Sequence, residues 1–281
     1  MPITRDSVRR YYEENTQLFT AFGGSNRVQN IHRGLWTDGA KTFEEALNIT
    51  NEWICAEIES TASTHAKISD LGCGVGAGLF YIFPRLKEPE YALGVTLSSL
   101  QAQIAGQSTR QLNLSSQIFF TESDFTCVPL ESGSLDAVYS VEAVAHALDP
   151  ESYFCEVSRL LGEGGRLILV DDFQASRTLE PAEQEWLNSF INGWHVPGVR
   201  TVDQSVIFAH QYDLQLIRNS NLTPFLRLRN LPDMLARLLR FLGNAVPIKH
   251  AILPSMLGSM ALQQCLHAGV IEYRFLVFEK R

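Results

Sequence analysis

The sequence predicts an α/β domain with a mostly parallel sheet that is covered by helices on both faces. Short apolar runs alternate with helical patterns between residues 66 and 172, which is the rhythm of βαβ units. A glycine-rich turn joins the first run to the first helical pattern. The length of 281 residues and the 45% hydrophobic content suit one domain with a large core.

The alternating region predicts five strands and three helices. The strands are expected at 66–71, 91–97, 117–122, 135–141 and 166–171. The helices are expected at 77–87, 98–112 and 150–161. Because a helical pattern separates most consecutive strands, the strands are expected to run parallel.

The flanking regions predict further helices that cover this core half. Two helices are expected before it, at 4–22 and 39–60. After residue 172 the expected order is an inserted helix and loop at 174–204, a helix at 205–219, a strand at 224–228, apolar helices at 232–243 and 250–267, and a last strand at 271–279. No linker divides the chain, so one domain is expected over 1–281.

Composition excludes several function classes. The chain has 23 basic and 31 acidic residues and a formal net charge of −8, which argues against a nucleic-acid binder that depends on phosphate contacts. The start lacks the apolar core of a signal peptide, and Pro247, Lys249 and Pro254 interrupt the most apolar late stretch, so no membrane span is expected. Five cysteines without metal-ligand spacing indicate no metal site and a reducing compartment, and the cytoplasm is expected.

The turn after the first strand carries the strongest functional signal. Asp70 ends the strand, and Gly72, Gly74 and Gly76 follow it. Glycines at this position let the backbone approach a ligand, and the helix that follows favours negative groups. Nicotinamide and flavin enzymes also use such a loop. A carboxylate before the glycines suits an ammonium or sulfonium better than a pyrophosphate, which disfavours an NAD-dependent oxidoreductase.

Together with its surroundings, this loop resembles the first motif of the class I S-adenosylmethionine-dependent methyltransferases. The resemblance extends over about residues 60 to 175. Ser123-Asp124-Phe125 is similar to the motif that faces the adenine, and the stretch from Leu160 to Leu167 resembles the turn into the fifth strand. The resemblance implies a Rossmann-like seven-stranded sheet of order 3-2-1-4-5-7-6 with the last strand antiparallel.

Four further stretches resemble one subgroup of that family. The second strand ends in Gly-Val-Thr96-Leu-Ser98-x-x-Gln101, where NAD enzymes and most methyltransferases carry a ribose-binding acid. This pattern looks like that of the sterol, tocopherol and prenyl-diphosphate C-methyltransferases and the cyclopropane fatty acid synthases. The stretch 141–146 is similar to the Ile-Glu-Ala-x-x-His stretch of sterol methyltransferases, and Tyr11-Tyr12 and 32–36 look like the helical entrance of the group.

The resemblance and the residues predict two sets of site residues. Those expected to hold S-adenosylmethionine are Tyr11, Asp70, Gly72, Gly74, Gly76, Thr96, Ser98, Gln101, Asp124 and Phe125. Those expected to be catalytic are Glu142, His146 and His195.

The roles of several of these residues have a structural alternative. Glu142 and His146 are expected to share one face of a short helical turn and to point at the transferred methyl group, with His146 titrating near neutrality. The alternative is a helix-capping acid and a partly exposed imidazole. Asp124 is expected to bind the adenine amino group, unless it caps the following turn. His195 belongs to an expected lid loop, where an isolated histidine is equally a structural residue.

The predicted domain organisation assigns a role to each part of the chain. Residues 1–60 form a helical lid, 61–173 the cofactor-binding core, 174–265 the substrate cover and 266–281 the final strand. The predicted activity is methylation of a small apolar metabolite, such as an isoprenoid or another specialised metabolite, with carbon slightly favoured. N- or O-methylation of an alkaloid or polyketide-like metabolite, and a non-catalytic or cyclase relative, stay open, as does a homo-oligomer.

Overall fold

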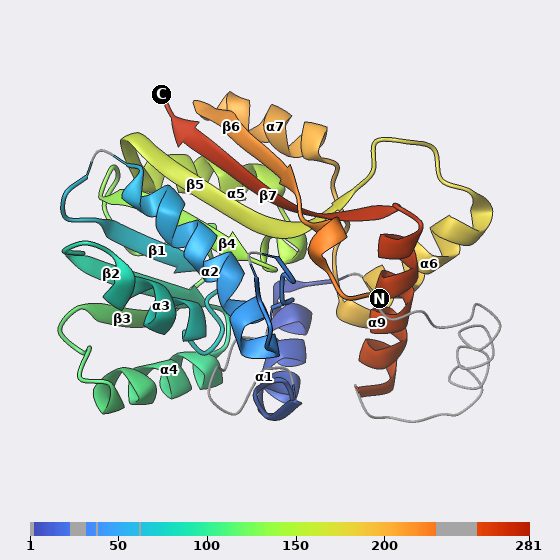
Figure 1. The fold of residues 1–281 in the computed structure, drawn as a ribbon, viewed down its shortest axis with the longest axis horizontal. Coiled ribbons are helices and arrows are strands. Elements are labelled where there is room, and N and C mark those ends of the chain that lie inside the picture. The colour runs from blue at the N-terminus through green and yellow to red at the C-terminus, as the bar shows by residue number, and fades with distance from the viewer. Residues whose placement is uncertain (1–2, 23–31, 38, 62, 229–251) are drawn as a thin grey trace.

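A seven-stranded sheet of order β3-β2-β1-β4-β5-β7-β6 forms the centre of the molecule (Figure 1). The computed structural model describes residues 3–22, 32–37, 39–61, 63–228 and 252–281. The strands are β1 Lys67–Leu71, β2 Tyr91–Thr96, β3 Ile118–Glu122, β4 Leu135–Val141, β5 Leu161–Gln174, β6 Leu214–Asn221 and β7 Ile271–Lys280. β1 to β5 run parallel, and β7 is antiparallel to both β5 and β6. The predicted strand order is confirmed.

Helices cover the sheet, and several have clear sequence signals for their first turns. The helices are α1 Arg5–Phe22, α2 Phe43–Glu59, α3 Ala77–Ile82, α4 Ser99–Gln111, α5 Pro150–Leu160, α6 Pro181–Trp194, α7 Val202–Gln211 and α9 Ile252–His267. Thr42 and Glu45 form a capping box at the start of α2. Asp149 caps α5, and Pro150 occupies its first position, where the missing N–H costs nothing.

The core consists of two apolar layers, one on each face of the sheet. Neighbouring residues of a strand point to opposite faces, so Ile168 of β5 belongs to one layer and Leu167 to the other. The first layer joins the sheet to α2, α3, α6 and α9, and the second joins it to α5 and α7. Central strands buried on both faces explain the continuous apolar runs in the sequence.

Two elements predicted in the C-terminal part are wrong. The helix expected at 205–219 ends at Gln211, and Leu214–Asn221 form β6. Asp213, with φ of 58°, turns the chain between the two elements. The strand expected at 224–228 is replaced by a 3-10 turn, Thr223–Phe225, and coil. β6 is an edge strand that exposes every second side chain, so its apolar content is low and its pattern weak.

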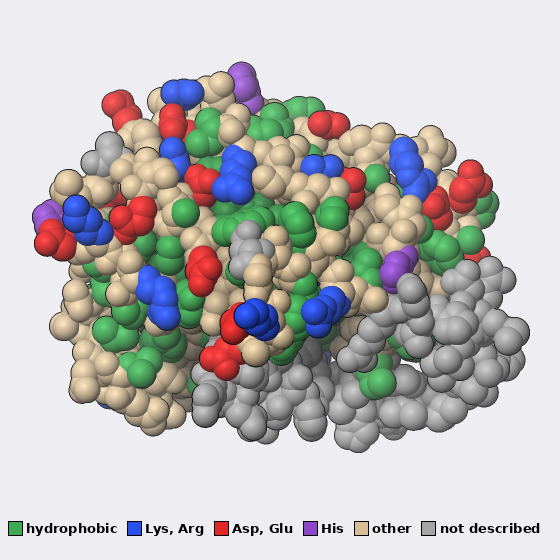
Figure 2. Space-filling view, viewed as in Figure 1, with side chains coloured by type: hydrophobic (Ala, Val, Ile, Leu, Met, Phe, Trp, Pro, Cys, Tyr) green, Lys and Arg blue, Asp and Glu red, His purple; other side chains and the backbone are tan. Residues whose placement is uncertain are grey.

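The remaining predictions for this region concern helices and surfaces. The helix expected at 232–243 lies outside the described residues. Among the described helices, none has the length and apolar character needed to cross a membrane. On the face shown in Figure 2, the basic side chains of the described residues are scattered among acidic ones and form no continuous basic surface of the kind that binds nucleic acid.

Candidate active site

A cavity of about 240 Å³ lies at the carboxyl ends of β1, β2 and β4. This is the edge at which open parallel sheets bind ligands. We call it the central cavity. Helices α1, α2, α6 and α9 contribute the side chains that cover it. Its described lining contains the carboxylates Asp70 and Glu142 but no lysine or arginine.

The glycine loop takes a backbone shape that other residues adopt with difficulty. Gly72 has φ of 97° and Gly74 has φ of 53°, both in the left-handed region. A Cβ on Gly72 would lie 2.3 Å from the Cβ of Ala143, so the loop packs directly on the segment after β4. Gly72 and Gly74 line the central cavity, whereas Gly76 does not and instead precedes α3.

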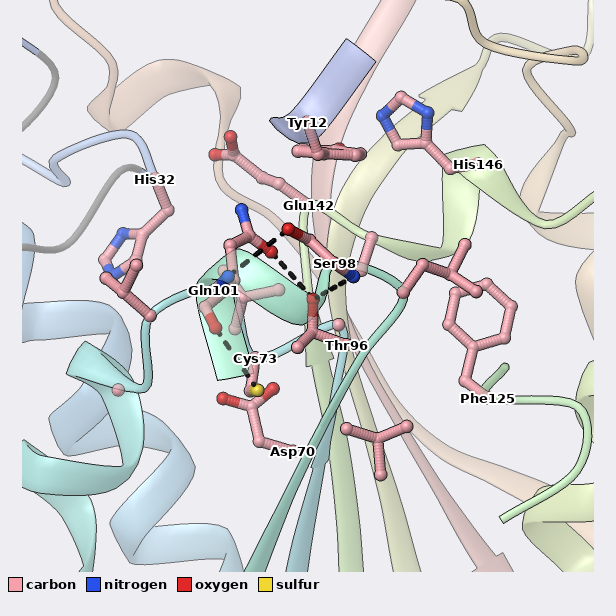
Figure 3. A pocket seen from close by; sticks show the side chains of 18 of the residues that line it. Tyr12, His32, Asp70, Cys73, Thr96, Ser98, Gln101, Phe125, Glu142 and His146 are labelled. Carbon is pink, nitrogen blue, oxygen red and sulfur yellow. Dashed lines mark hydrogen bonds between the residues drawn. The ribbon is translucent and has the colours of Figure 1, made fainter. Parts of the chain in front are cut away.

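Asp70 lies at the bottom of the cavity, as Figure 3 shows. Asp70 is only 5% exposed to solvent. Burial raises the pKa of its carboxyl to about 7, and the neighbouring Tyr139 hydroxyl opposes part of the rise. A buried carboxylate without a cationic partner is costly, and a ligand ammonium would supply that partner.

Thr96, Ser98 and Gln101 form one hydrogen-bonded group on the cavity wall (Figure 3). The Thr96 hydroxyl donates to Gln101 Oε1 at 2.7 Å, and the Ser98 amide donates to Thr96 Oγ1 at 3.3 Å. Gln101 Nε2 donates to Thr16 Oγ1 of α1 at 3.1 Å. These hydrogen bonds therefore connect Thr96, Ser98 and Gln101 to the helical cover. Their role in binding the cofactor ribose, in place of an acidic residue, remains a prediction.

Asp124 and Phe125 occupy different environments. Phe125 lines the central cavity, and Asp124 does not. The Asp124 carboxylate accepts hydrogen bonds from the backbone and hydroxyl of Thr126, both at 2.8 Å, and pairs with Arg5 at 2.6 Å. The side chain thus caps the turn, which is the structural alternative to its predicted adenine contact.

Glu142 lines the cavity from the bend after β4. The expected helical turn shared with His146 is wrong, because the 3-10 turn spans only Val144–His146. Glu142 precedes it with φ of 51°. Both side chains nevertheless face the same cavity, at the end opposite Asp70 (Figure 3).

His146 is partly buried beside Tyr12 of α1, with ring centroids 5.3 Å apart. Burial lowers the pKa of His146 to about 4. The expectation that it titrates near neutrality is therefore wrong, since desolvation disfavours the charged ring. At pH 7 the imidazole is neutral and able to accept a proton or a hydrogen bond.

His195 ends α6 and does not line the central cavity. Its ring lies 5.4 Å from that of Tyr11, which does line the cavity. The preceding residue, Trp194, lines it too, and its indole N–H donates to Ser255 O and Ser259 Oγ of α9 at 3.2 Å each. Of the predicted lid loop, Trp194 lines the cavity. The catalytic role of His195 remains a prediction.

Among the polar residues that line the cavity, sequence reasoning missed Asn51 and His32 as site residues. Asn51 is buried on α2 in the row formed with Leu47, Ile54 and Ile58. A lone amide in an apolar row of a helix was the available signal. His32 opens the 32–36 stretch, which carried only a resemblance to an entrance segment.

The polar atoms of the cavity fit S-adenosylmethionine. Asn51 Nδ2, His32 Nε2 and His146 Nδ1 are buried and have no hydrogen-bond partner among the described residues. Buried polar atoms are normally satisfied, so these indicate a polar ligand. Asp70 suits its ammonium, and the open space at Gly74 admits a ligand next to the backbone. When bound, the cofactor supplies an electrophilic methyl group on a sulfonium.

Comparison with known proteins gives consistent matches. Residues 69–169 match a family model described as a methyltransferase domain. Tocopherol O-methyltransferase of Arabidopsis thaliana is 25% identical over 302 residues, covering 98% of this chain and 82% of that protein. A sterol 24-C-methyltransferase of Gibberella zeae is 29% identical over 157 residues, covering 56% of this chain and 39% of that protein.

A solved structure shares the whole fold. Geranyl diphosphate C-methyltransferase from Streptomyces coelicolor, in complex with Mg²⁺, geranyl diphosphate and S-adenosyl-L-homocysteine, superimposes with a TM-score of 0.75 at 16% identity and covers 100% of both chains. The strand order, the acidic glycine loop and the family match define the class I methyltransferase fold. The protein is an S-adenosylmethionine-dependent methyltransferase.

Proposed function

We propose that the enzyme methylates a neutral, apolar small molecule, such as an isoprenoid or another specialised metabolite, at carbon. The observation that carries this proposal is the lining of the cavity opposite Asp70. The Tyr12 ring lies there beside Glu142 and His146 (Figure 3). The Tyr11 ring is 5.5 Å from that of Tyr12, and Trp194 also lines the cavity. The described lining offers no cationic side chain to an anionic acceptor.

This lining suits the chemistry of an alkene acceptor. Methylation of an alkene leaves a positive charge on the acceptor, and aromatic faces and a carboxylate stabilise such a charge. The Glu142 carboxylate or the neutral His146 ring then takes the proton that restores a double bond. The covering helices contribute by orienting the acceptor and excluding water.

A second candidate is O-methylation. With a pKa of about 4, the His146 ring is unprotonated at pH 7 and can accept a hydrogen bond from an acceptor hydroxyl that loses its proton in the reaction. The Arabidopsis relative is itself named an O-methyltransferase. In this case the proton leaves oxygen as the methyl group arrives, and no cationic acceptor forms.

Incubation with methyl-deuterated S-adenosylmethionine and a panel of neutral terpenoids, phenols and alkaloids tests both candidates. Mass spectrometry finds labelled products, and NMR of a product places the label on carbon, oxygen or nitrogen. Label on carbon of a neutral apolar acceptor supports the proposal, and label on oxygen favours the second candidate. Cofactor binding without any labelled product would favour the non-methylating relatives.

We also infer a reducing compartment such as the cytoplasm. Cys55, Cys73, Cys127 and Cys155 are free thiols in the structure. Thiols are kept reduced in such compartments, whereas oxidising ones favour disulfides. Localisation of a tagged full-length protein checks this inference.

A further inference from the structure

A buried cluster lies behind Glu142, outside the lining of the central cavity. It consists of Arg33 from the entrance stretch, Asp172 from β5 and Tyr273 from β7. Asp172 and Tyr273 are directly opposed residues of the antiparallel β5–β7 pair. The Arg33 guanidinium forms two hydrogen bonds to the Asp172 carboxylate, both at 2.6 Å, and lies 4.4 Å from the centre of the Tyr273 ring.

The cluster binds one oxygen of the Glu142 carboxylate. The backbone N–H of Arg33 donates to Glu142 Oε1 at 2.9 Å, and the Tyr273 hydroxyl donates to the same atom at 2.9 Å. Arg33 Nε lies 3.7 Å from it. Within the described part of the chain, Oε2 receives no hydrogen bond. One oxygen of the carboxylate is thus held in place, and the other remains available to a ligand in the cavity that Glu142 lines.

Asp172, rather than Glu142, takes up most of the hydrogen-bonding capacity of the Arg33 guanidinium. Asp172 engages the fork of Arg33 with two hydrogen bonds, which is the strong geometry for this pair. The guanidinium is therefore largely neutralised by Asp172, and Glu142 meets only its Nε side at 3.7 Å.

The backbone at Glu142 needs such support. Its φ of 51° is unusual for a residue with a side chain, and strained residues persist only where their surroundings hold them. The amide of Glu142 donates to Val170 O at 2.8 Å, which fixes one side of the bend. Its carboxylate, held by Arg33 and Tyr273, fixes the other.

We propose that Arg33 is a positioning residue that, together with Tyr273, orients Glu142 for proton transfer in the central cavity. The proposal rests on the role assigned to Glu142 in the proposed function. Groups that hold a catalytic side chain within a fraction of an ångström act on turnover rather than on ligand affinity. The entrance stretch that carries Arg33 is thereby part of the catalytic machinery as well as of the cover.

The test compares four variants. Arg33→Gln removes the cation, Arg33→Lys keeps it without the fork, and Tyr273→Phe removes one hydroxyl. Arg166→Gln is the matched control. The Arg166 side chain of β5 is 15% exposed against 18% for that of Arg33, forms a 2.8 Å pair with Glu57 of α2, and does not line the central cavity.

Three measurements are made on each folded variant. Hydrogen exchange of peptide 142–147 reports local opening of the segment that carries Glu142. It should be about tenfold faster in Arg33→Gln than in wild type, less affected in Arg33→Lys and Tyr273→Phe, and unchanged in the Arg166→Gln control. S-adenosylhomocysteine should bind each variant within about twofold of wild type by calorimetry. With an acceptor from the labelling panel, kcat of Arg33→Gln should fall about 10- to 100-fold with acceptor KM within about threefold, and Arg33→Lys should recover part of the loss.

The outcomes separate this inference from the proposed function. Unchanged exchange of peptide 142–147 in both Arg33→Gln and Tyr273→Phe would overturn the positioning role. Faster exchange with no labelled product from wild type would leave the contact established and refute the proposed function. If Arg33→Gln does not fold, Tyr273→Phe carries the same test, and an unaltered exchange rate and kcat in that variant overturn the inference.

Discussion

Replacing Asp70 with asparagine should stabilise the ligand-free protein and weaken cofactor binding. The carboxyl is buried, and its pKa is raised from 3.8 to about 7, chiefly by desolvation. Asparagine has nearly the same shape and no charge. The substitution therefore removes the cost of a buried carboxylate together with the group that suits the ligand ammonium.

The size of the effect on stability follows from the pKa. The unfolded chain loses the Asp70 proton near pH 3.8 and the folded protein near pH 7, so raising the pH between these values favours unfolding. The loss of folding free energy that Asp70 causes is absent below about pH 4. It grows by about 1.4 kcal/mol per pH unit and reaches about 4 kcal/mol near pH 7 and above. Asp70→Asn should raise the melting temperature at pH 8 by several degrees, at about 2–4 °C per kcal/mol, and by less at pH 5.

The effect on binding has the opposite sign. Losing the charge-assisted hydrogen bond should weaken S-adenosylhomocysteine binding by about 1.5–3 kcal/mol, or about 10- to 150-fold. In the wild type, binding favours the ionised carboxylate, so affinity should fall as the pH drops below about 7. Calorimetry at pH 7 in buffers of different ionisation enthalpy should detect release of about half a proton on binding.

Asp171→Asn is the matched control. Asp171 is also buried, with a pKa raised to about 7 by burial and by Asp172, but it does not line the central cavity. The Asp171→Asn variant should bind S-adenosylhomocysteine within about twofold of wild type. If Asp70→Asn binds S-adenosylhomocysteine as tightly as wild type and melts at the same temperature at pH 8, the assignment of Asp70 is refuted.

Three further predictions concern catalysis, closure and the glycine loop. Glu142→Gln and His146→Ala should keep cofactor affinity and lower turnover by about 10²–10⁴-fold, with a double variant far from additive; normal turnover in both would refute their role. Because the pKa of His146 is about 4, the rate should show no histidine limb between about pH 6 and 7. Hydrogen exchange of α6 should slow when cofactor and acceptor bind, and an unchanged rate would argue against a lid. Gly72→Ala should lower stability by about 1–3 kcal/mol, measured by denaturant unfolding, because its Cβ would lie 2.3 Å from that of Ala143; unchanged stability would contradict the loop geometry.

Local patterns in the sequence determined the core half of the fold. β1, the glycine loop and α3 are consecutive, and each has its own signal in apolar runs, glycines and helix starts. The strand positions of β2 and β4 follow in the same way, because a central parallel strand is apolar nearly throughout. Asp70 and Thr96 were recognised because each stands at a strand end, where topology alone brings residues to the ligand edge.

Tertiary structure decided what depends on groups distant in the chain. β6 escaped prediction because an edge strand is defined by its partner β7 more than by its own residues. The pKa of His146 depends on burial beneath α1, which no local pattern reports. Arg33 meets Asp172 across 139 positions of sequence, and only folding of the sheet and its cover brings their charges within hydrogen-bonding distance.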